Sequence, residues 1–295
     1  MSTFVKIRNK IGRFYADYDV YLKPLFKFMA AFLSMLIFKG YFSFDTKLTS
    51  YVVIALLSAV CMLFPYGGVT FADAVYILLG IYKSSLAAAV LFSVFLVLIL
   101  LLYFGFRPGK GIILCLVPVF FILKIPFVIP LVLGLLTGFT AIIPSAIGVF
   151  AFYLLKYCNE YMAVSEYTTD LTEIIKDTVT LATSVAGFKE IYIYIAAFVV
   201  AETVITILKN MSFDHSWTAA VITGSLIMGI ITVSGALLFN TAPDYVLIIV
   251  NIFVSAAAGL ATELFFFNVD YTRTEHLRFE DDDYFYYVKA IPKVK

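Results

Sequence analysis

Five polar side chains interrupt or border the long apolar runs of this sequence, and these residues are the best suited to chemistry. Glu202 lies near the middle of the run 190–209, with about two helical turns of apolar sequence on either side. A charged side chain at the centre of a bilayer costs at least ~2.5–3.5 kcal/mol, so such a residue usually has a function. The chemistry expected of this set is a proton or cation relay, or a counter-charge for a transported substrate. The candidates are Glu202, Asn251, Asp73, Glu263 and Lys124.

A purely structural role is the alternative for each of these side chains. An interhelical hydrogen bond or ion pair, for example between Glu202 and a lysine or threonine, contributes about 0.6 kcal/mol on average and implies no function. Glu263 lies near the end of the last apolar run, where its side chain can reach the membrane interface. The sequence leaves both interpretations open.

Motifs for catalysis or metal binding are absent from the sequence. Cys61, Cys115 and Cys158 are far apart and lack Cys-x-x-Cys spacing, so we expect them to pack as small apolar side chains. His215 and His276 have no neighbour at a ligand spacing. No phosphate-binding glycine loop, nucleophile elbow or His-Glu-x-x-His motif occurs. We therefore expect no metal, no cofactor and no enzymatic activity.

The composition places these side chains in a membrane. Of the 295 residues, 62% are hydrophobic and 14% are charged, against about 25% charged residues in soluble domains. A soluble protein of this size cannot bury so much apolar surface, so we expect an integral membrane protein that contacts lipid. The net charge of +1 argues against a nucleic-acid-binding protein.

The apolar runs predict an all-α polytopic membrane protein. A helix that crosses the membrane needs about 20 apolar residues, and unbroken runs of that length exclude the alternating pattern of a β-barrel. Six runs are long enough to be full transmembrane helices. They are 25–44, 86–106, 139–158, 190–209, 217–240 and 245–268.

Two further regions, 51–83 and 112–138, each consist of two short apolar helices separated by a break rich in proline and glycine. Each pair is either two short spans or one re-entrant hairpin, so the chain crosses the membrane between six and ten times. Irregular backbone at membrane depth must be covered by protein or line a wet cavity, so we expect both breaks inside the bundle. The order of short helix, break, short helix and long helix occurs twice, as in transporters built from repeats.

The charged residues outside the apolar runs set the expected orientation and the division of the chain. Six basic residues occur up to Lys27, whereas the connection 159–189 is acidic. By the positive-inside rule, both termini are cytoplasmic in a plasma membrane and the connection is outside. Within it, 164–186 predicts an amphipathic helix, which is either a lid or the polar start of the next span. The expected segments are 1–24 (basic and amphipathic), 25–158 (first bundle), 159–189 (outer connection), 190–268 (three-helix bundle) and 269–295 (cytoplasmic tail).

Small residues at a spacing of four mark helix faces that can approach another helix closely. Helices 217–240 and 245–268 are joined by only four residues and must form an antiparallel hairpin. Their small faces either pack together or form a dimer interface. The three pairs are Gly134 with Gly138, Ser225 with Gly229, and Ser255 with Gly259.

The tail has the most distinctive composition outside the membrane runs. Four acidic residues are followed directly by four aromatic residues, and the aromatic run has a high β-propensity that suits addition to the edge of a partner's sheet. The expected partner-binding residues are Phe279, Glu280, Asp281, Asp282, Asp283, Tyr284, Phe285, Tyr286 and Tyr287.

Two functions follow from these patterns. The first is a non-catalytic membrane subunit or scaffold whose tail recruits a cytoplasmic protein, or that associates with a second copy. The alternative is a small secondary transporter or substrate-binding membrane component that uses the broken helices and Glu202. The sequence names neither a substrate nor a partner.

Overall fold

A computed structural model describes residues 3–44, 49–106, 111–164, 167, 170–266, 275–281 and 283–290. The structure is 84% helical, with 12 α-helices over these residues, and the all-α prediction is confirmed. The elements are α1 (Thr3–Asp17), α2 (Asp19–Phe42), α3 (Tyr51–Cys61), α4 (Tyr66–Ser84), α5 (Leu86–Phe106), α6 (Ile112–Ile122), α7 (Val128–Leu136), a 3₁₀ turn (Gly138–Ala141), α8 (Ile142–Val164), α9 (Leu171–Gly187), α10 (Lys189–Lys209), α11 (Ser216–Phe239), α12 (Tyr245–Phe266), β1 (Glu275–Glu280) and β2 (Phe285–Ala290).

Five helical segments are long and apolar enough to cross a membrane, counted over the described residues. They correspond to five of the six expected spans. The sixth, 86–106, is helical throughout as α5, but only its part Leu86–Leu101 is counted, among the shorter apolar helices. The five are Asp19–Phe42, Gly138–Val164, Lys189–Lys209, Ser216–Phe239 and Tyr245–Phe266.

The two broken pairs are present as α3–α4 and α6–α7. The prediction that both breaks lie inside the bundle is wrong for the first break. It holds in part for the second, where Pro126 and Phe127 are buried and the Lys124 carbonyl accepts the Asn251 amide of α12. Leu63 in the first break is 85% exposed, and Lys124 in the second is also exposed. The physical reason is that local turns satisfy the backbone. In the second break the Lys124 N–H donates to the Phe121 carbonyl, and the first break forms similar short bonds. The two pairs also pack differently, since both α3 and α6 contact α2 and α4, but α6 packs most extensively on α8.

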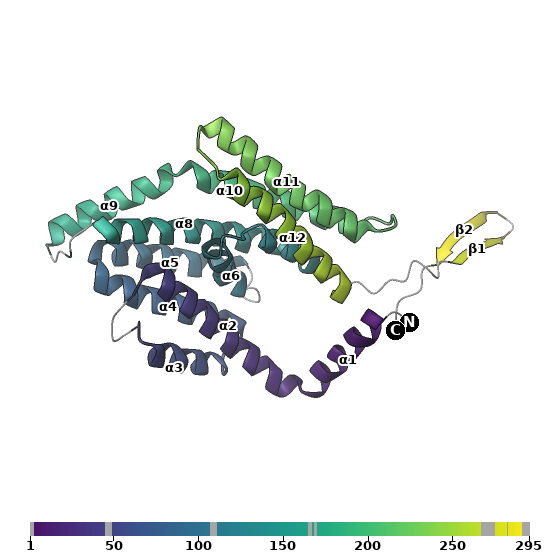
Figure 1. Ribbon diagram of the computed structural model, residues 1–295, viewed down its shortest axis with the longest axis horizontal. Coiled ribbons are helices and arrows are strands. Elements are labelled where there is room, and N and C mark those ends of the chain that lie inside the picture. Colours follow the sequence, from purple (N-terminus) through teal and green to yellow (C-terminus); the bar gives the residue numbers. More distant parts are fainter. Residues whose placement is uncertain are drawn as a thin grey trace.

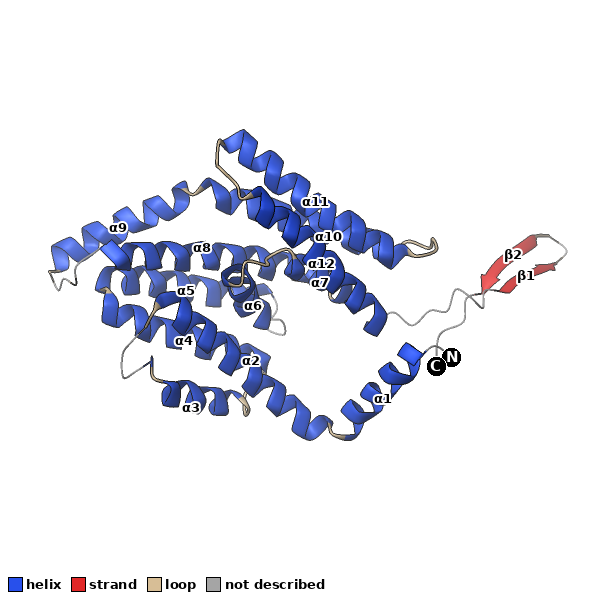
Figure 2. Cartoon of the chain, viewed as in Figure 1, coloured by secondary structure: helices blue, strands red, loops and turns tan. Residues whose placement is uncertain are grey.

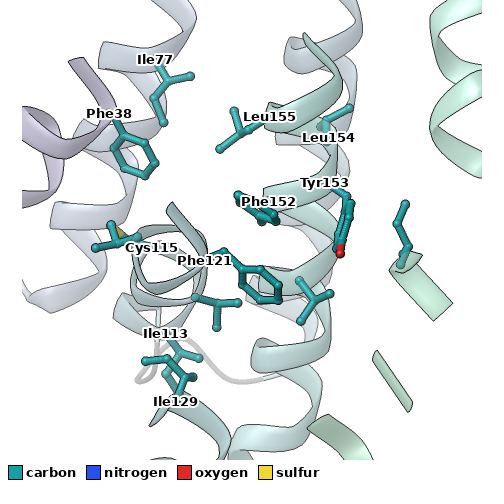
Figure 3. Packing of buried hydrophobic residues seen from close by; sticks show 14 of the residues in the cluster. Phe38, Ile77, Ile113, Cys115, Phe121, Ile129, Phe152, Tyr153, Leu154 and Leu155 are labelled. Atoms are coloured by element: carbon teal, nitrogen blue, oxygen red, sulfur yellow. The ribbon is translucent and has the colours of Figure 1, made fainter. Parts of the chain in front are cut away.

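The helices form two groups that share α8. Helices α2 to α6 pack on one another and on α8, while α7 packs with α10, α11 and α12. In Figure 1 most of the long helices run roughly along the horizontal axis, with α9 at one end and α1 at the other. An aromatic cluster fixes the junction of the groups. Phe121 of α6 stacks on Phe152 of α8 with ring centroids 4.5 Å apart (Figure 3), and it also meets Phe198 of α10 at 5.8 Å.

Helix α9 lies within the region where an amphipathic helix was expected. Its first turn is capped by the Asp170 carboxylate, which accepts the Thr172 N–H. One face, which includes Leu181, is buried where the helix packs on α5 and α8, while Ile175 and Val179 on the other face are more than half exposed. The chain then breaks at Phe188 before α10, so α9 is a separate helix and not the beginning of the next span.

The tail forms an antiparallel β-hairpin and not a single extended strand. Strands β1 and β2 pair with Phe279 opposite Tyr286, and Figure 2 shows both strands apart from the helices. The acidic run makes the turn, because the Asp281 carboxylate accepts the N–H groups of Asp283 and Tyr284. Such a side chain-to-backbone turn is what lets the acidic residues reverse the chain. Asp282 lies outside the described residues.

Candidate functional site

Asp73 of α4 is the centre of the candidate site. It is 2% exposed and has partners on two other helices. The Ser34 hydroxyl of α2 lies 2.8 and 2.9 Å from the two carboxylate oxygens, and the Cys115 thiol of α6 lies 2.7 Å from Oδ2. Helices α2, α4 and α6 therefore meet at one carboxylate.

The donors available to Asp73 are few. The Ser34 hydroxyl carries a single proton and is also 3.0 Å from the carbonyl of Ala31, so it cannot donate to both groups at once. The thiol of Cys115 is a weak donor. A carboxylate has about four lone-pair sites, so these two neutral groups leave part of its capacity unused.

A cavity of about 620 Å³ adjoins this carboxylate. Residues from α2, α3, α4, α5, α6 and α8 line it, and most of them are aliphatic or aromatic. The Thr70 hydroxyl is already engaged, since it donates to the Gly111 carbonyl at 2.8 Å. Among the described lining residues there is no lysine, arginine or histidine. Asp73 is therefore an acidic group in an apolar chamber whose described lining holds no protein cation.

The cavity reaches the surface beside the first break. Val60 of α3, Phe64 of the break and Phe71 of α4 all line the cavity, and each is about half exposed. These three side chains belong to the side of the helix bundle, where α3 and α4 are apolar. The three exposed side chains at this opening are thus all apolar.

Glu202 of α10 forms a second and different carboxylate site. It is completely buried, and its Oε2 accepts the Ser145 hydroxyl of α8 at 3.0 Å. Its Oε1 has no hydrogen-bond partner among the described residues. The Thr206 hydroxyl bonds the backbone carbonyl of Glu202 at 2.6 Å and not its carboxylate. The structure therefore shows a serine partner where a lysine or threonine had been considered.

The remaining candidates lie in separate places. The Asn251 amide donates at 2.9 Å to the backbone carbonyl of Lys124, so α12 is tied to the second break. Glu263 accepts the Thr218 hydroxyl of α11 at 2.8 Å. No hydrogen bond among the described residues joins Glu202 to Asp73, Asn251 or Glu263. The hydrogen bonds described for these groups are therefore separate from one another.

The small residues of α11 and α12 lie at contacts within the chain. A Cβ added to Gly229 would overlap Ile252 of α12, and one added to Gly259 would overlap Leu131 and Val221. Both partner serines are buried as well, Ser225 at 2% and Ser255 at 0% exposure. These helix faces pack against other helices of the same chain, where α7, α11 and α12 approach one another closely.

The pair Gly134 and Gly138 likewise lies at a close contact within the chain, at α7 and the turn that follows it. A Cβ on Gly134 would lie 2.9 Å from Ile205 of α10. Gly138 has a φ of +68°, a left-handed conformation that glycine adopts readily, and it starts the 3₁₀ turn that leads into α8. Nearby, the Lys209 ammonium donates to the carbonyl of Leu135 at 2.8 Å, which neutralises the end of α7.

Sequence reasoning identified Asp73 but missed its two partners. Ser34 and Cys115 are isolated small residues within apolar runs, and neither has a motif or a spacing that links it to Asp73. The one signal in the sequence was the occurrence of an aspartate next to a broken helix pair. No protein-family model, no curated protein and no solved structure matches this chain.

Proposed function

We propose that this chain is a multi-pass membrane protein that binds a small lipophilic ligand in the cavity beside Asp73, as a substrate-binding component or a small secondary transporter. The observation that carries the proposal is the cavity itself. Its volume of about 620 Å³ lies in the range of about 300–1,000 Å³ that is typical of ligand pockets. Its apolar lining with one well-placed acidic group is also typical of such sites.

The proposed location is a plasma membrane with both termini in the cytoplasm. The support for this orientation is the cluster of basic residues before the first span and the acidic connection 159–189. The five long apolar helices supply the membrane anchor. In this arrangement the opening near Phe64 and Phe71 faces the side of the bundle, so a lipophilic ligand would enter from the bilayer.

Filling the cavity tests this proposal. Ala151 of α8 lines the cavity, so Ala151→Phe should occupy its volume, whereas Ala257→Phe places the same side chain at an exposed position on α12. We expect 4-phenylbutan-1-ol to bind the wild type and Ala257→Phe in lipid nanodiscs, with a loss of affinity of about tenfold or more in Ala151→Phe. Equal affinity in all three proteins, measured by calorimetry, would contradict the proposal.

Partner recruitment by the tail is the second candidate function, and the hairpin favours it. An isolated two-stranded hairpin is at best marginally stable in water. The cross-strand register places Leu277, Phe279, Tyr286 and Val288 on one face, and each of these side chains is between about a third and a half exposed. An apolar face of this kind is stabilised when a partner protein covers it.

The register also supplies a matched test of recruitment. Phe279→Ser together with Tyr286→Ser removes the stacked ring pair of the apolar face. Tyr287→Ser alters the opposite face, where the Arg278 guanidinium lies over that ring. If the tail recruits a partner, a stoichiometric protein should co-purify with the wild type and with Tyr287→Ser, and should be missing from the double variant. Purification alone in every case would refute recruitment.

A further inference from the structure

We infer that the ligand of this cavity carries a protonated amine, whose ammonium group pairs with the Asp73 carboxylate while its apolar body fills the chamber. This inference rests on the proposed function, since it names the class of ligand for the same cavity. It concerns a single chemical group, the cation, and is tested by comparing two probes that differ in that group alone.

The environment of Asp73 is the first argument. A buried carboxylate is unfavourable unless it is paired or fully hydrogen-bonded. Here Ser34 and Cys115 are its hydrogen-bonding partners, and the Ser34 proton is shared with the Ala31 carbonyl. An ammonium group brings three donors and a positive charge, and the described lining holds no basic residue that could supply that charge.

The lining of the chamber is the second argument. Phe38 of α2 and Phe92 of α5 are buried within the lining, and Phe71 stands at the opening. Aromatic side chains accept both an apolar body and a nearby cation. Figure 3 labels Phe38, Cys115 and Leu155, lining residues that come from three different helices. The ligand that fits is therefore a lipophilic amine of modest size.

Other ligand classes fit the same chamber less well. An anionic ligand would bring a second negative charge beside Asp73, and the described lining offers no basic residue to balance it. A neutral lipid chain would fill the volume but would leave the carboxylate without a counter-charge. Charge complementarity with Asp73 therefore favours a cationic ligand over an anionic or a neutral one.

The experiment compares 4-phenylbutylamine with 4-phenylbutan-1-ol, which share one apolar body. Binding is measured by calorimetry to the full-length protein in nanodiscs of neutral phosphatidylcholine, at a pH where the amine is charged. We expect the amine to bind the wild type at least about tenfold more tightly than the alcohol, since a hydrogen bond to a charged group exceeds a neutral one by this order. Asp73→Asn should abolish that preference, so that the two probes bind this variant with equal affinity.

Glu202→Gln is the matched control, because Glu202 is also a buried carboxylate with one serine partner but does not line the cavity. It should retain the preference for the amine. Equal binding of the two probes by the wild type, or a preference that survives Asp73→Asn, would overturn the amine inference and leave the proposed cavity in place. If neither probe shows saturable binding, both the amine inference and the proposed ligand-binding function of the cavity are overturned.

A second measurement on the wild type covers the case in which Asp73→Asn does not fold. Photolabelling with 4-azidobenzylamine, followed by peptide mapping, should modify peptides within 51–84 and 112–122, which hold the lining of α3, α4 and α6. Protection by 4-phenylbutylamine should exceed protection by the alcohol. Labels confined to helices that do not line the cavity, such as α10, α11 and α12, would overturn the inference.

Discussion

Two buried carboxylates show how similar residues acquire different roles. Asp73 and Glu202 each accept a hydrogen bond from one serine on a neighbouring helix, and both are almost inaccessible. Asp73 lines the cavity of about 620 Å³, whereas Glu202 is not among the residues that line it. Glu202 is fully buried, and over the part of the chain that the structure describes one of its carboxylate oxygens has no hydrogen-bond partner. At the scale of the residue, the space around the carboxylate and not the carboxylate itself distinguishes the proposed binding site from a helix contact.

Removal of the serine beside Glu202 should destabilise the protein. Ser145→Ala takes away the hydroxyl donor of a fully buried carboxylate, so we expect the free energy of unfolding to fall by about 1–3 kcal/mol. Ser225→Ala is the control, because this buried serine donates only to the Ile222 carbonyl of its own helix. Denaturant titration of both variants measures the difference. Equal losses would show that the Ser145–Glu202 bond adds nothing to stability.

Single methyl groups should separate close helix contacts from open positions. Gly259→Ala would overlap Leu131 and Val221, so we expect a loss of about 1–3 kcal/mol from overpacking. Gly40→Ala lies in α2 with no atom within 4 Å of the new Cβ, and alanine at such a helical site stabilises by about 0.4–1 kcal/mol. Opposite shifts in the thermal midpoint are the expected result. A neutral effect of Gly259→Ala would contradict the close packing of α12.

At the scale of the element, the tail hairpin depends on its acidic turn. The Tyr286 hydroxyl donates to the Asp281 carboxylate at 2.8 Å, and the N–H groups of Tyr284 and Asp283 donate at 2.7 and 3.0 Å. These bonds, led by that from Tyr286, hold the pKa of Asp281 below its ordinary value. The turn is therefore formed with the ionised carboxylate.

The hairpin should consequently open in acid. Because the pKa of Asp281 is lower in the folded turn than in the open chain, the stabilisation is complete above the ordinary aspartate value of about 3.9 and disappears as the pH falls through the lowered pKa. NMR contacts between the rings of Phe279 and Tyr286 should weaken over that range. Asp281→Asn keeps an acceptor at the turn and should remove the dependence on pH. An unchanged hairpin at pH 2 would refute this role of Asp281.

Helix α9 illustrates how a short element can present two apolar faces. The face that includes Leu181 packs on α5 and α8, while Leu171, Ile175 and Val179 follow one another at intervals of four residues on the exposed side. Residues at that interval lie on one side of a helix. The exposed row is apolar, so it is suited to contact with lipid at the membrane surface.

The arrangement of the whole molecule predicts which segments share a side of the membrane. In Figure 1, α1 and the C-terminal end of α12 lie toward one end of the molecule, and α9 lies toward the other. Gly12→Cys and Tyr284→Cys should therefore react with an impermeant maleimide from the cytoplasmic side, and Thr172→Cys from the opposite side. The wild type is the background control, since all three native cysteines are buried. Labelling of Gly12→Cys and Thr172→Cys from the same side would contradict the proposed topology.

Much of the architecture could be predicted from the sequence because it depends on composition and local pattern. Long apolar runs can only be satisfied as helices in a bilayer, and five such helices are present at the expected places. The proline- and glycine-rich breaks end helices through local backbone restrictions, so α3–α4 and α6–α7 were also predictable. The β-propensity of the aromatic tail is likewise a local property, although the turn that folds it into a hairpin was not recognised.

The candidate site depended on contacts between distant parts of the chain, and only the tertiary structure decided it. Ser34 lies 39 residues before Asp73 in the sequence, and Cys115 lies 42 residues after it. No periodicity links the three residues. The cavity exists because six helices leave a space that their side chains do not fill. The sequence by itself determined where helices form and that five of them are long and apolar enough to cross a membrane, since the chain carries those preferences locally. The packing of the helices determined which acidic residue faces a chamber and which is closed in, because that outcome depends on the shapes of all the neighbouring side chains together.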